Sequence, residues 1–337
     1  MILLTQDEIM HSWKSSSEEI LVSIDCITFN HENYITDTLD GFLKQKTDFP
    51  FEVLIHDDAS TDGTSEIIRK YEKKYPLIIK PIYQTENQWS KGVRNISSIY
   101  NFPRAKGKYI AFCEGDDYWI DENKIQMQVD FLQKNPEYGI CYTYAKEFFQ
   151  NKQKFSKNRF GNYVDSFEDL LINGNRIPTL TVCARKELIT QYVAEIKPQE
   201  HNWLMGDYPM WLYIAFKSKV QFFDKITAVY RVLQNSASHS TDVEKRIEFS
   251  KNVYEIKKFF SKEYNIEIEK HSEEYVRFHV FIDLLNESYR KTFSNELRKT
   301  YQSIQNKNLK DRIYNFASYN FILWKILQFL ISLWRMK

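Results

Sequence analysis

The fold is decided by the stretch FEVLIHDDASTDGT, residues 51–64, in which a strand signal changes into a helix start. Residues 51–55 are mostly apolar and bulky, which predicts a strand, and two carboxylates follow at Asp57 and Asp58. The turn at 60–64 is rich in residues that cap helices, and the apolar residues behind it recur at helical spacing. The stretch therefore predicts a strand–turn–helix unit.

The same alternation extends along the chain in both directions. The βαβ pattern that it forms is typical of an α/β fold with a largely parallel sheet. After Thr241 the strand signals stop, and helical spacing continues to the last residue. We therefore expect an α/β domain over 1–240 and a helical C-terminal region over 241–337. Further strands are predicted at 21–29, 77–83, 109–113, 140–145, 180–183 and 220–230, and helices at 124–134 and 208–217.

Composition excludes several classes of protein. The chain has 337 residues, of which 43% are hydrophobic and 27% are charged, a balance typical of globular domains rather than of disordered chains. Its 46 basic and 45 acidic residues nearly cancel. Since nucleic-acid binders use a strong positive field, we expect no nucleic-acid partner, and any phosphate must be bound at a local site.

The cysteines and the terminus indicate a cytoplasmic protein. Cys26, Cys113, Cys141 and Cys183 lie far apart, each in an apolar run, which predicts buried reduced thiols. The first residues lack the basic flank and the apolar stretch of a secretory signal. No apolar run reaches the 18 residues of an ordinary transmembrane helix.

The last segment, 321–337, predicts a helix with an unusual surface. Trp324 and Trp334 stand beside its polar residues, and amphipathic rings and cations favour the headgroup boundary of a membrane. We therefore expect peripheral association with the inner face of the cytoplasmic membrane, and the alternative is a helix buried against its own domain or a partner. The polar residues form one narrow stripe: Lys325, Gln328, Ser332 and Arg335.

Polar residues follow three of the predicted strands. In open α/β sheets, ligands bind beyond the carboxyl ends of the strands, so these residues should converge. Adjacent carboxylates repel one another and need a cation or donors. Oxygen ligands favour Mg²⁺ or Mn²⁺, which substrate phosphates commonly complete. The sequence thus predicts a divalent-metal site for a phosphorylated substrate, built from 28–30, 57–60 and 114–117.

The phosphates need side-chain ligands, because the nine glycines form neither a G-x-G-x-x-G motif nor a P-loop. Lys91 and Arg94, in the polar stretch 86–95, are candidate ligands for a diphosphate. The alternative is that both are ordinary surface charges.

At this point a resemblance appears. DDASTDGT at 57–64, together with CEGDDYW at 113–119, resembles the family 2 glycosyltransferases of the GT-A fold. The similarity covers roughly 18–240, and Asn87, Gly92, Asn95 and 104–109 occur in the family's order. The resemblance implies a Rossmann-like central sheet flanked by helices, a nucleotide-diphosphate sugar donor (a UDP-sugar favoured), Mn²⁺ or Mg²⁺, and inversion at the anomeric centre.

The resemblance also implies roles for single residues of the donor site. Thr28 and Asn30 would border the nucleoside. Asp57 and Asp58 would belong to the same site, with Asp58 hydrogen-bonded to the base.

The metal motif would be Glu114, Asp116 and Asp117, with Asp116 or Asp117 ligating the cation directly. Glu114 stands where Asp is commoner, so it would reach either the metal or only the ribose. Residues 230–240 resemble the family's closing segment, in which a His can complete the metal or diphosphate site, and His239 is the candidate.

Inverting transfer needs a base for the acceptor hydroxyl. MGDYPMW at 205–211 resembles the family's base segment, with Asp207 as the base and Gly206 where an acid is common. Asp207 could instead only cap the helix that follows. Trp119 and Trp211 are placed to line the acceptor pocket or, alternatively, belong to the core.

We therefore expect a metal-dependent, inverting glycosyltransferase of the hexosyltransferase type, acting on a lipid-linked glycan in capsule or other envelope polysaccharide biosynthesis. One alternative is a sugar-phosphate nucleotidyltransferase, although residues 29–33 lack its Gly- and Arg-rich loop. Another is an inactive sugar-nucleotide-binding or scaffold subunit, against which the intact acids at Asp58, Asp116, Asp117 and Asp207 argue.

Overall fold

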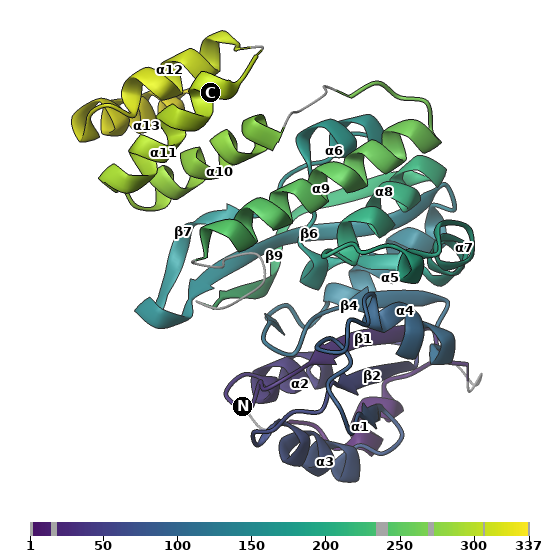
Figure 1. The fold of residues 1–337 in the computed structure, drawn as a ribbon. Coiled ribbons are helices and arrows are strands. Elements are labelled where there is room, and N and C mark those ends of the chain that lie inside the picture. The colour runs from purple at the N-terminus through teal and green to yellow at the C-terminus, as the bar shows by residue number, and fades with distance from the viewer. Residues whose placement is uncertain (1–2, 15–18, 234–241, 269–272, 306, 336–337) are drawn as a thin grey trace. The chain divides into compact units, whose positions relative to one another are not determined.

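The computed structural model describes residues 3–14, 19–233, 242–268, 273–305 and 307–335 (Figure 1). The chain forms two compact units, Met1–Leu233 and Gln234–Lys337. The first unit is an α/β fold, as predicted. Its strands are β1 (Val22–Thr28), β2 (Phe51–Asp57), β3 (Ile79–Tyr83), β4 (Tyr109–Phe112), β5 (Tyr118–Trp119), β6 (Tyr138–Phe149), β7 (Lys154–Phe160), β8 (Cys183–Arg185) and β9 (Lys219–Val232).

Helices flank this sheet, and most begin close to where the apolar spacing predicts. Helix α5 has the predicted limits, and α8 begins one residue earlier than predicted. The α-helices of the first unit are α1 (Gln6–His11), α2 (Ile35–Leu43), α3 (Thr64–Lys74), α4 (Ile96–Tyr100), α5 (Lys124–Lys134), α6 (Phe167–Asn173), α7 (Lys186–Ile196) and α8 (Asp207–Lys217).

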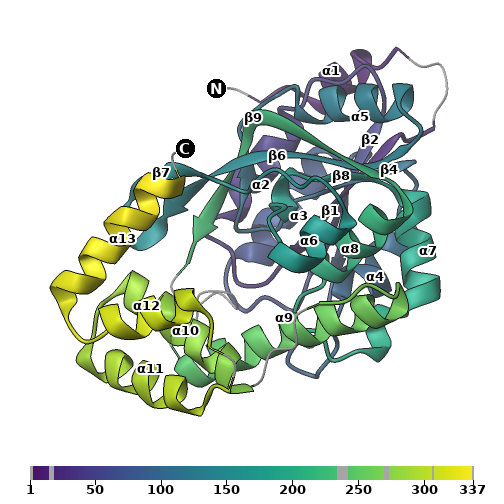
Figure 2. The ribbon, with the colours of Figure 1, turned by 90° about the horizontal axis from the view of Figure 1, so that it is seen from above.

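The sheet order is β3-β2-β1-β4-β8-β6-β9-β5, and β7 pairs with β6. The half β3-β2-β1-β4 is parallel, so its carboxyl ends lie at one edge. In this register Thr28 is paired with Asp57. The other half is mixed: β8 is antiparallel to both neighbours, whereas β6 and β9 run parallel side by side (Figure 2). The parallel half is what brings the predicted site residues together.

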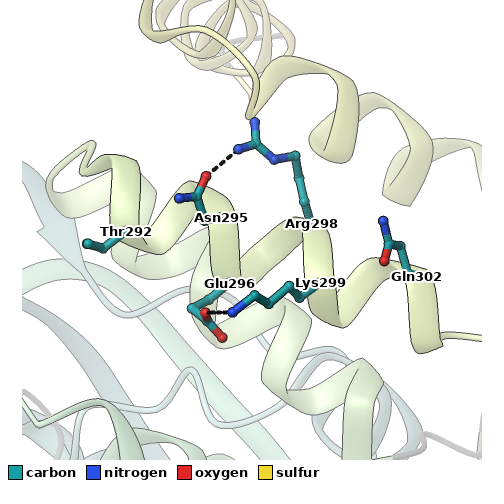
Figure 3. Close-up of a pocket in the computed structure, with 6 residues that line it drawn as sticks. All are labelled: Thr292, Asn295, Glu296, Arg298, Lys299 and Gln302. Atoms are coloured by element: carbon teal, nitrogen blue, oxygen red, sulfur yellow. Dashed lines mark hydrogen bonds and ion pairs between the residues drawn. The ribbon is translucent and has the colours of Figure 1, made fainter.

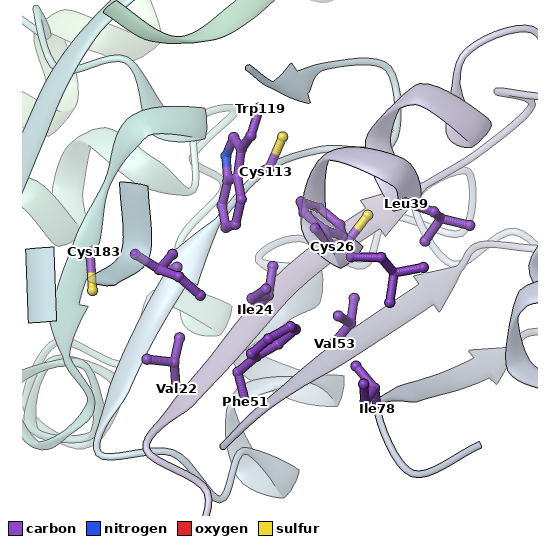
Figure 4. Packing of buried hydrophobic residues seen from close by; sticks show 14 of the residues in the cluster. Val22, Ile24, Cys26, Leu39, Phe51, Val53, Ile78, Cys113, Trp119 and Cys183 are labelled. Atoms are coloured by element: carbon purple, nitrogen blue, oxygen red, sulfur yellow. The ribbon is translucent and has the colours of Figure 1, made fainter. Parts of the chain in front are cut away.

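The core lies between the parallel strands and the helices that cover them. Val22, Ile24 and Val53 point from β1 and β2 into this core, where Trp119 packs as well (Figure 4). All four cysteines are buried free thiols, as predicted: Cys26, Cys113, Cys141 and Cys183. Close packing of these apolar side chains holds the strand ends in a fixed register.

One predicted strand, 180–183, is largely a turn. Residues Thr179–Thr181 form a 3₁₀ helix, and the strand β8 begins only at Cys183. The Thr181 hydroxyl donates to the carbonyl of Pro178 (2.8 Å) and closes the turn. A side-chain hydrogen bond of this kind competes with strand pairing.

The second unit is helical, as predicted. Its buried cluster includes Phe278, Leu285, Leu297 and Trp324. Within the described residues, no helix has the length and apolar character needed to cross a membrane. The helices are α9 (Val243–Glu263), α10 (Glu273–Glu287), α11 (Lys291–Ser303), α12 (Leu309–Ala317) and α13 (Phe321–Arg335).

Candidate active site

The end of β1 and the turn after β4 are interlocked. Gly115 donates its amide to the carbonyl of Ile27 (2.9 Å), and a Cβ at Gly115 would lie 2.5 Å from Thr28 Oγ1 and 3.0 Å from His31 Nδ1. Thr28 Oγ1 and His31 Nδ1 are themselves hydrogen-bonded at 3.1 Å. Only glycine fits this space, so the acidic turn that follows β4 is fixed against β1.

Glu114 and Asp116 lie close enough in this turn for their charges to interact. Burial, reinforced by the negative charge of Asp116, raises the pKa of Glu114 to about 8. Asp207 and Asp25 add to this repulsion. In the described part of the chain, no hydrogen bond reaches the Asp116 carboxylate, whereas its carbonyl accepts from Arg231 Nη1 (2.7 Å). A cation near Glu114 and Asp116 would relieve this repulsion.

Asp117 has a different role from its neighbour. It is buried, and its Oδ1 accepts the backbone amide of Arg231 in β9 (2.7 Å), while its carbonyl accepts the Thr38 hydroxyl (2.6 Å). Burial and the charges of Asp116 and Glu114 raise the pKa of Asp117. Asp117 thus ties the turn to β9, and of these two carboxylates the one that stays open to a ligand is that of Asp116.

Asp57, after β2, is buried and fully engaged with hydroxyl and amide donors. Its Oδ1 accepts from the Ser60 amide (3.1 Å) and hydroxyl (2.5 Å), and its Oδ2 accepts from Ser65. Asn30 joins the same turn, because its side-chain oxygen accepts the Thr61 amide at 2.7 Å. Both predicted donor-site residues therefore hold the loop that leads into α3.

Asp58 anchors the next loop. Its two carboxylate oxygens accept the amides of Gln88 (2.7 Å) and Trp89 (3.0 Å). In that loop Lys91 pairs with Glu86, and Arg94 stacks on the Trp89 ring at 4.2 Å and donates to its carbonyl at 3.0 Å. The structure therefore places both cations within their own loop instead of beside the carboxylates, which fits the surface-charge alternative.

Asp207 lies at the start of α8, where it faces the carboxylates after β4 closely enough to raise the pKa of Glu114. Its Oδ2 accepts from Thr179 Oγ1 (2.7 Å) and Asn175 Nδ2 (3.0 Å). Gly206 occupies the N-cap position and Asp207 is the first helical residue, but its Oδ1 accepts the amide of Tyr208 (2.7 Å), so the carboxylate also satisfies a backbone donor at the helix start, as the capping alternative expects. Neutral donors therefore hold both oxygens of this carboxylate.

The predicted acceptor-lining role of Trp119 and Trp211 is corrected by their burial. Trp119 is 3% exposed, packs on Phe42, and donates its Nε1 to the Leu180 carbonyl (2.7 Å). Trp211 is fully buried against Phe112. Neither ring offers a face to an acceptor sugar, so both belong to the core. His239 lies outside the described residues.

Two residues of the site were not expected from the sequence. His31 lies beside Gly115, and burial lowers its pKa although Asp116 acts against this. Arg231 is buried and pairs with Asp37 while holding the backbone of Asp116. His31 stands just after a strand end, so its position was a usable signal, whereas Arg231 is separated from this turn by more than 100 residues.

The donor set at the site fits a hard divalent cation that a substrate completes. Among the described residues, no group of three or more His, Cys, Asp or Glu side chains is arranged to hold a metal. Mg²⁺ is usually bound by one or two carboxylates together with substrate phosphates. Glu114 and Asp116 supply such a pair.

A hollow on α11 in the second unit has a different character (Figure 3). Arg298 there bonds to Asn295, and Lys299 bonds to Glu296 at 2.7 Å, so the polar groups pair with near neighbours on one helix. The lining residues are Thr292, Asn295, Glu296, Arg298, Lys299 and Gln302.

Two bacterial proteins are similar in sequence to this chain. The uncharacterized Mycobacterium tuberculosis protein Rv1520 is 33% identical over 67% of this chain and 62% of its own length, so the chain spans less than two thirds of that relative. The Escherichia coli enzyme WfgD, named as a UDP-Glc:alpha-D-GlcNAc-diphosphoundecaprenol beta-1,3-glucosyltransferase, is 28% identical over 66% of this chain and 81% of its own.

A solved structure shows the same fold. Staphylococcus aureus TarS 1-349 in complex with UDP-GlcNAc superposes with a TM-score of 0.53 and 17% identity, covering 85% of this chain and 82% of its own. This likeness confirms the GT-A architecture. Residues 23–189 match the family described as Glycosyl transferase family 2, and they include the ends of β1, β2 and β4. Residues 23–189 of this chain form a domain of glycosyl transferase family 2.

Proposed function

We propose that the protein is an inverting, metal-dependent glycosyltransferase that moves a sugar from a nucleotide diphosphate, with a UDP-sugar favoured, to a hydroxyl of a glycan. The observation that carries this proposal is the placement of Glu114 and Asp116 beside Thr28 and His31 on one side and within the electrostatic reach of Asp207 on the other. Family membership and the UDP-GlcNAc complex of the TarS neighbour support it.

The binding half of the reaction would be performed at the turn after β4. Asp116, with Glu114 beside it, would hold Mn²⁺ or Mg²⁺, which when bound neutralises the charge of the leaving diphosphate. Thr28 and His31, which pack on the same turn, would border the donor. Asp57 and Asp58 would shape this half indirectly, because their carboxylates fix the loops around it.

The proton would be handled by Asp207. In a single displacement the acceptor oxygen bonds to the anomeric carbon as the bond to the diphosphate breaks, and Asp207 would take the proton of the acceptor hydroxyl. The hydrogen bonds from Thr179 and Asn175 orient its carboxylate. Asp207 is close enough to Glu114 to affect its pKa but is separate from Glu114 and Asp116, so it could take the proton while they hold the cation.

The acceptor would be a lipid-linked glycan in the synthesis of an envelope polysaccharide. The relative WfgD carries a diphosphoundecaprenol acceptor in its name, which supports this class. Such acceptors would place the reaction at the inner face of the cytoplasmic membrane.

Donor hydrolysis provides a test without the acceptor. Purified protein would be incubated with Mn²⁺ and a panel of nucleotide sugars, and release of the nucleoside diphosphate would be measured. We expect one donor class to be hydrolysed slowly, and we expect EDTA and Asp116→Asn to abolish the reaction. A hydrolysis rate that neither EDTA nor Asp116→Asn lowers would contradict the proposed site.

A further inference from the structure

Helix α13 packs one apolar face on its own unit, and large exposed apolar side chains lie elsewhere around the described part of the helix. Trp324 is fully buried, and Leu327 and Ile331 pack against the unit's core. Around the helix from these residues, large apolar side chains are about half or more exposed: Ile322 (65%), Ile326 (50%), Phe329 (61%) and Leu330 (55%). An exposed apolar face of this kind marks an interaction surface.

The polar stripe and one of the tryptophans of α13 contact the helix's own unit. Gln328, from the polar stripe, donates to the carbonyl and side-chain oxygens of Asn286 in α10 (3.2 Å each), and Lys325 donates to Gln328 (2.9 Å). Trp324 is in the core and cannot reach a headgroup layer. The side chains of Ser332, Trp334 and Arg335 lie outside the described residues.

The preceding helix, α12, contributes a second row of exposed apolar side chains. Leu309 is 74% exposed, Ile313 43% and Phe316 66%, at the spacing of four and three residues that forms one helix face. The two consecutive helices therefore both present aliphatic and aromatic side chains to solvent. We call these seven residues of α12 and α13 the apolar surface.

The charge of this segment identifies the partner. Residues 307–337 contain six basic residues and one acid, Asp311, so their net charge is +5. Asp311 is buried and accepts the Asn308 amide at 3.1 Å. Lys310, Arg312 and Lys325, in contrast, are exposed. Exposed cations among apolar side chains fit the boundary between anionic headgroups and acyl chains.

We propose that the apolar surface docks the protein on an anionic lipid bilayer, with α13 lying along the membrane plane. The buried face ties α13 to its unit, so the helix can present only its outer face. A symmetric pairing with a second copy would bring the same cations of both copies together and is therefore disfavoured. The proposal is independent of which sugar is transferred.

Flotation of the full chain with vesicles tests this directly. Wild type should float with phosphatidylglycerol–phosphatidylcholine vesicles and bind pure phosphatidylcholine more weakly. Ile326→Glu/Leu330→Glu should bind at least about 100-fold more weakly, because burying one aliphatic side chain favours binding about tenfold or more. The control Leu77→Glu/Ile172→Glu, at positions 56% and 58% exposed, should bind like wild type.

Several results would overturn the proposal. The first is that wild type does not float with the vesicles, and the second is that Ile326→Glu/Leu330→Glu floats as well as wild type. The third is that light scattering shows wild type as a dimer and the variant as a monomer. Melting temperatures would verify folding, and the milder pair Ile326→Ser/Leu330→Ser would replace the Glu variant if it unfolds. Nucleoside diphosphate binding, measured in parallel, would separate a failure here from a failure of the proposed activity.

Discussion

The acids after β2 and the acids after β4 look alike in the sequence but stand in opposite surroundings. Asp57 and Asp58 accept hydrogen bonds from hydroxyls and amides of their own loops. Glu114 instead meets burial and the negative charge of Asp116, which raise its pKa to about 8. Nearby hydrogen-bond donors, and not the acids themselves, therefore decide whether a carboxylate holds a loop or stays open to a ligand.

The largest effect should come from Asp207, a third carboxylate, which neutral donors hold on both oxygens. We expect Asp207→Asn to lower transfer to the acceptor by about 10² to 10⁴, the range for losing a general base. Binding of UDP and Mn²⁺ and the melting temperature should stay near wild type. The measurement is the transfer rate at saturating donor. Asp165→Asn, an exposed acid in the same unit, serves as control, and full turnover by the Asp207 variant would remove it from the mechanism.

The buried cation Lys124 offers a comparison with these buried acids, because burial opposes its charge as well. Lys124 is fully buried, with Nζ donating to Gln128 Oε1 (2.8 Å), and burial lowers its pKa to about 8 from 10.5. Between these pH values the unfolded chain binds a proton that the folded chain does not, so this group makes stability rise with pH. The window corresponds to roughly 3 kcal/mol.

Urea unfolding of wild type and Lys124→Met at pH 7 to 11 measures this contribution as a difference between the two proteins. We expect the variant to be the more stable at pH 7 and its advantage to disappear toward pH 10.5. An advantage that does not change with pH would show that Lys124 keeps its proton in the core.

A smaller effect separates the two acid pairs by stability. Asp57→Asn removes an acceptor that serves Ser60 and Ser65, so we expect a loss of about 1–3 kcal/mol in the free energy of unfolding. Asp116→Asn, measured without metal, should leave this free energy unchanged or slightly higher, because a repulsive charge is gone. An equal loss of unfolding free energy in both variants would contradict the proposed difference between the two acid pairs.

Much of the fold was predictable because its signals are local. The helix 124–134 and the strand–turn–helix unit at 51–64 follow from apolar spacing and turn residues, and the structure confirms both. The strand β7 escaped prediction because its residues are mainly polar and exposed, so no alternating pattern marks it. Its pairing with β6 depends on tertiary context instead.

The site was predictable as a set of strand ends but not as a set of contacts. Nothing near Trp119 in the sequence shows that the Leu180 carbonyl would take its indole proton. The ties from Arg231 to the Asp116–Asp117 turn join positions more than 100 residues apart. Burial and long-range hydrogen bonds therefore decide which of the candidate residues remain open to a ligand.

Calorimetry of UDP binding tests most directly whether Glu114 and Asp116, the acids after β4, bind a cation together with the diphosphate. Wild type should bind UDP with Mn²⁺ and lose most of that affinity in EDTA. Asp116→Asn in Mn²⁺ should bind only as weakly as wild type in EDTA, while retaining its melting temperature. Undiminished, Mn²⁺-dependent affinity in Asp116→Asn would contradict the claim and place the cation elsewhere.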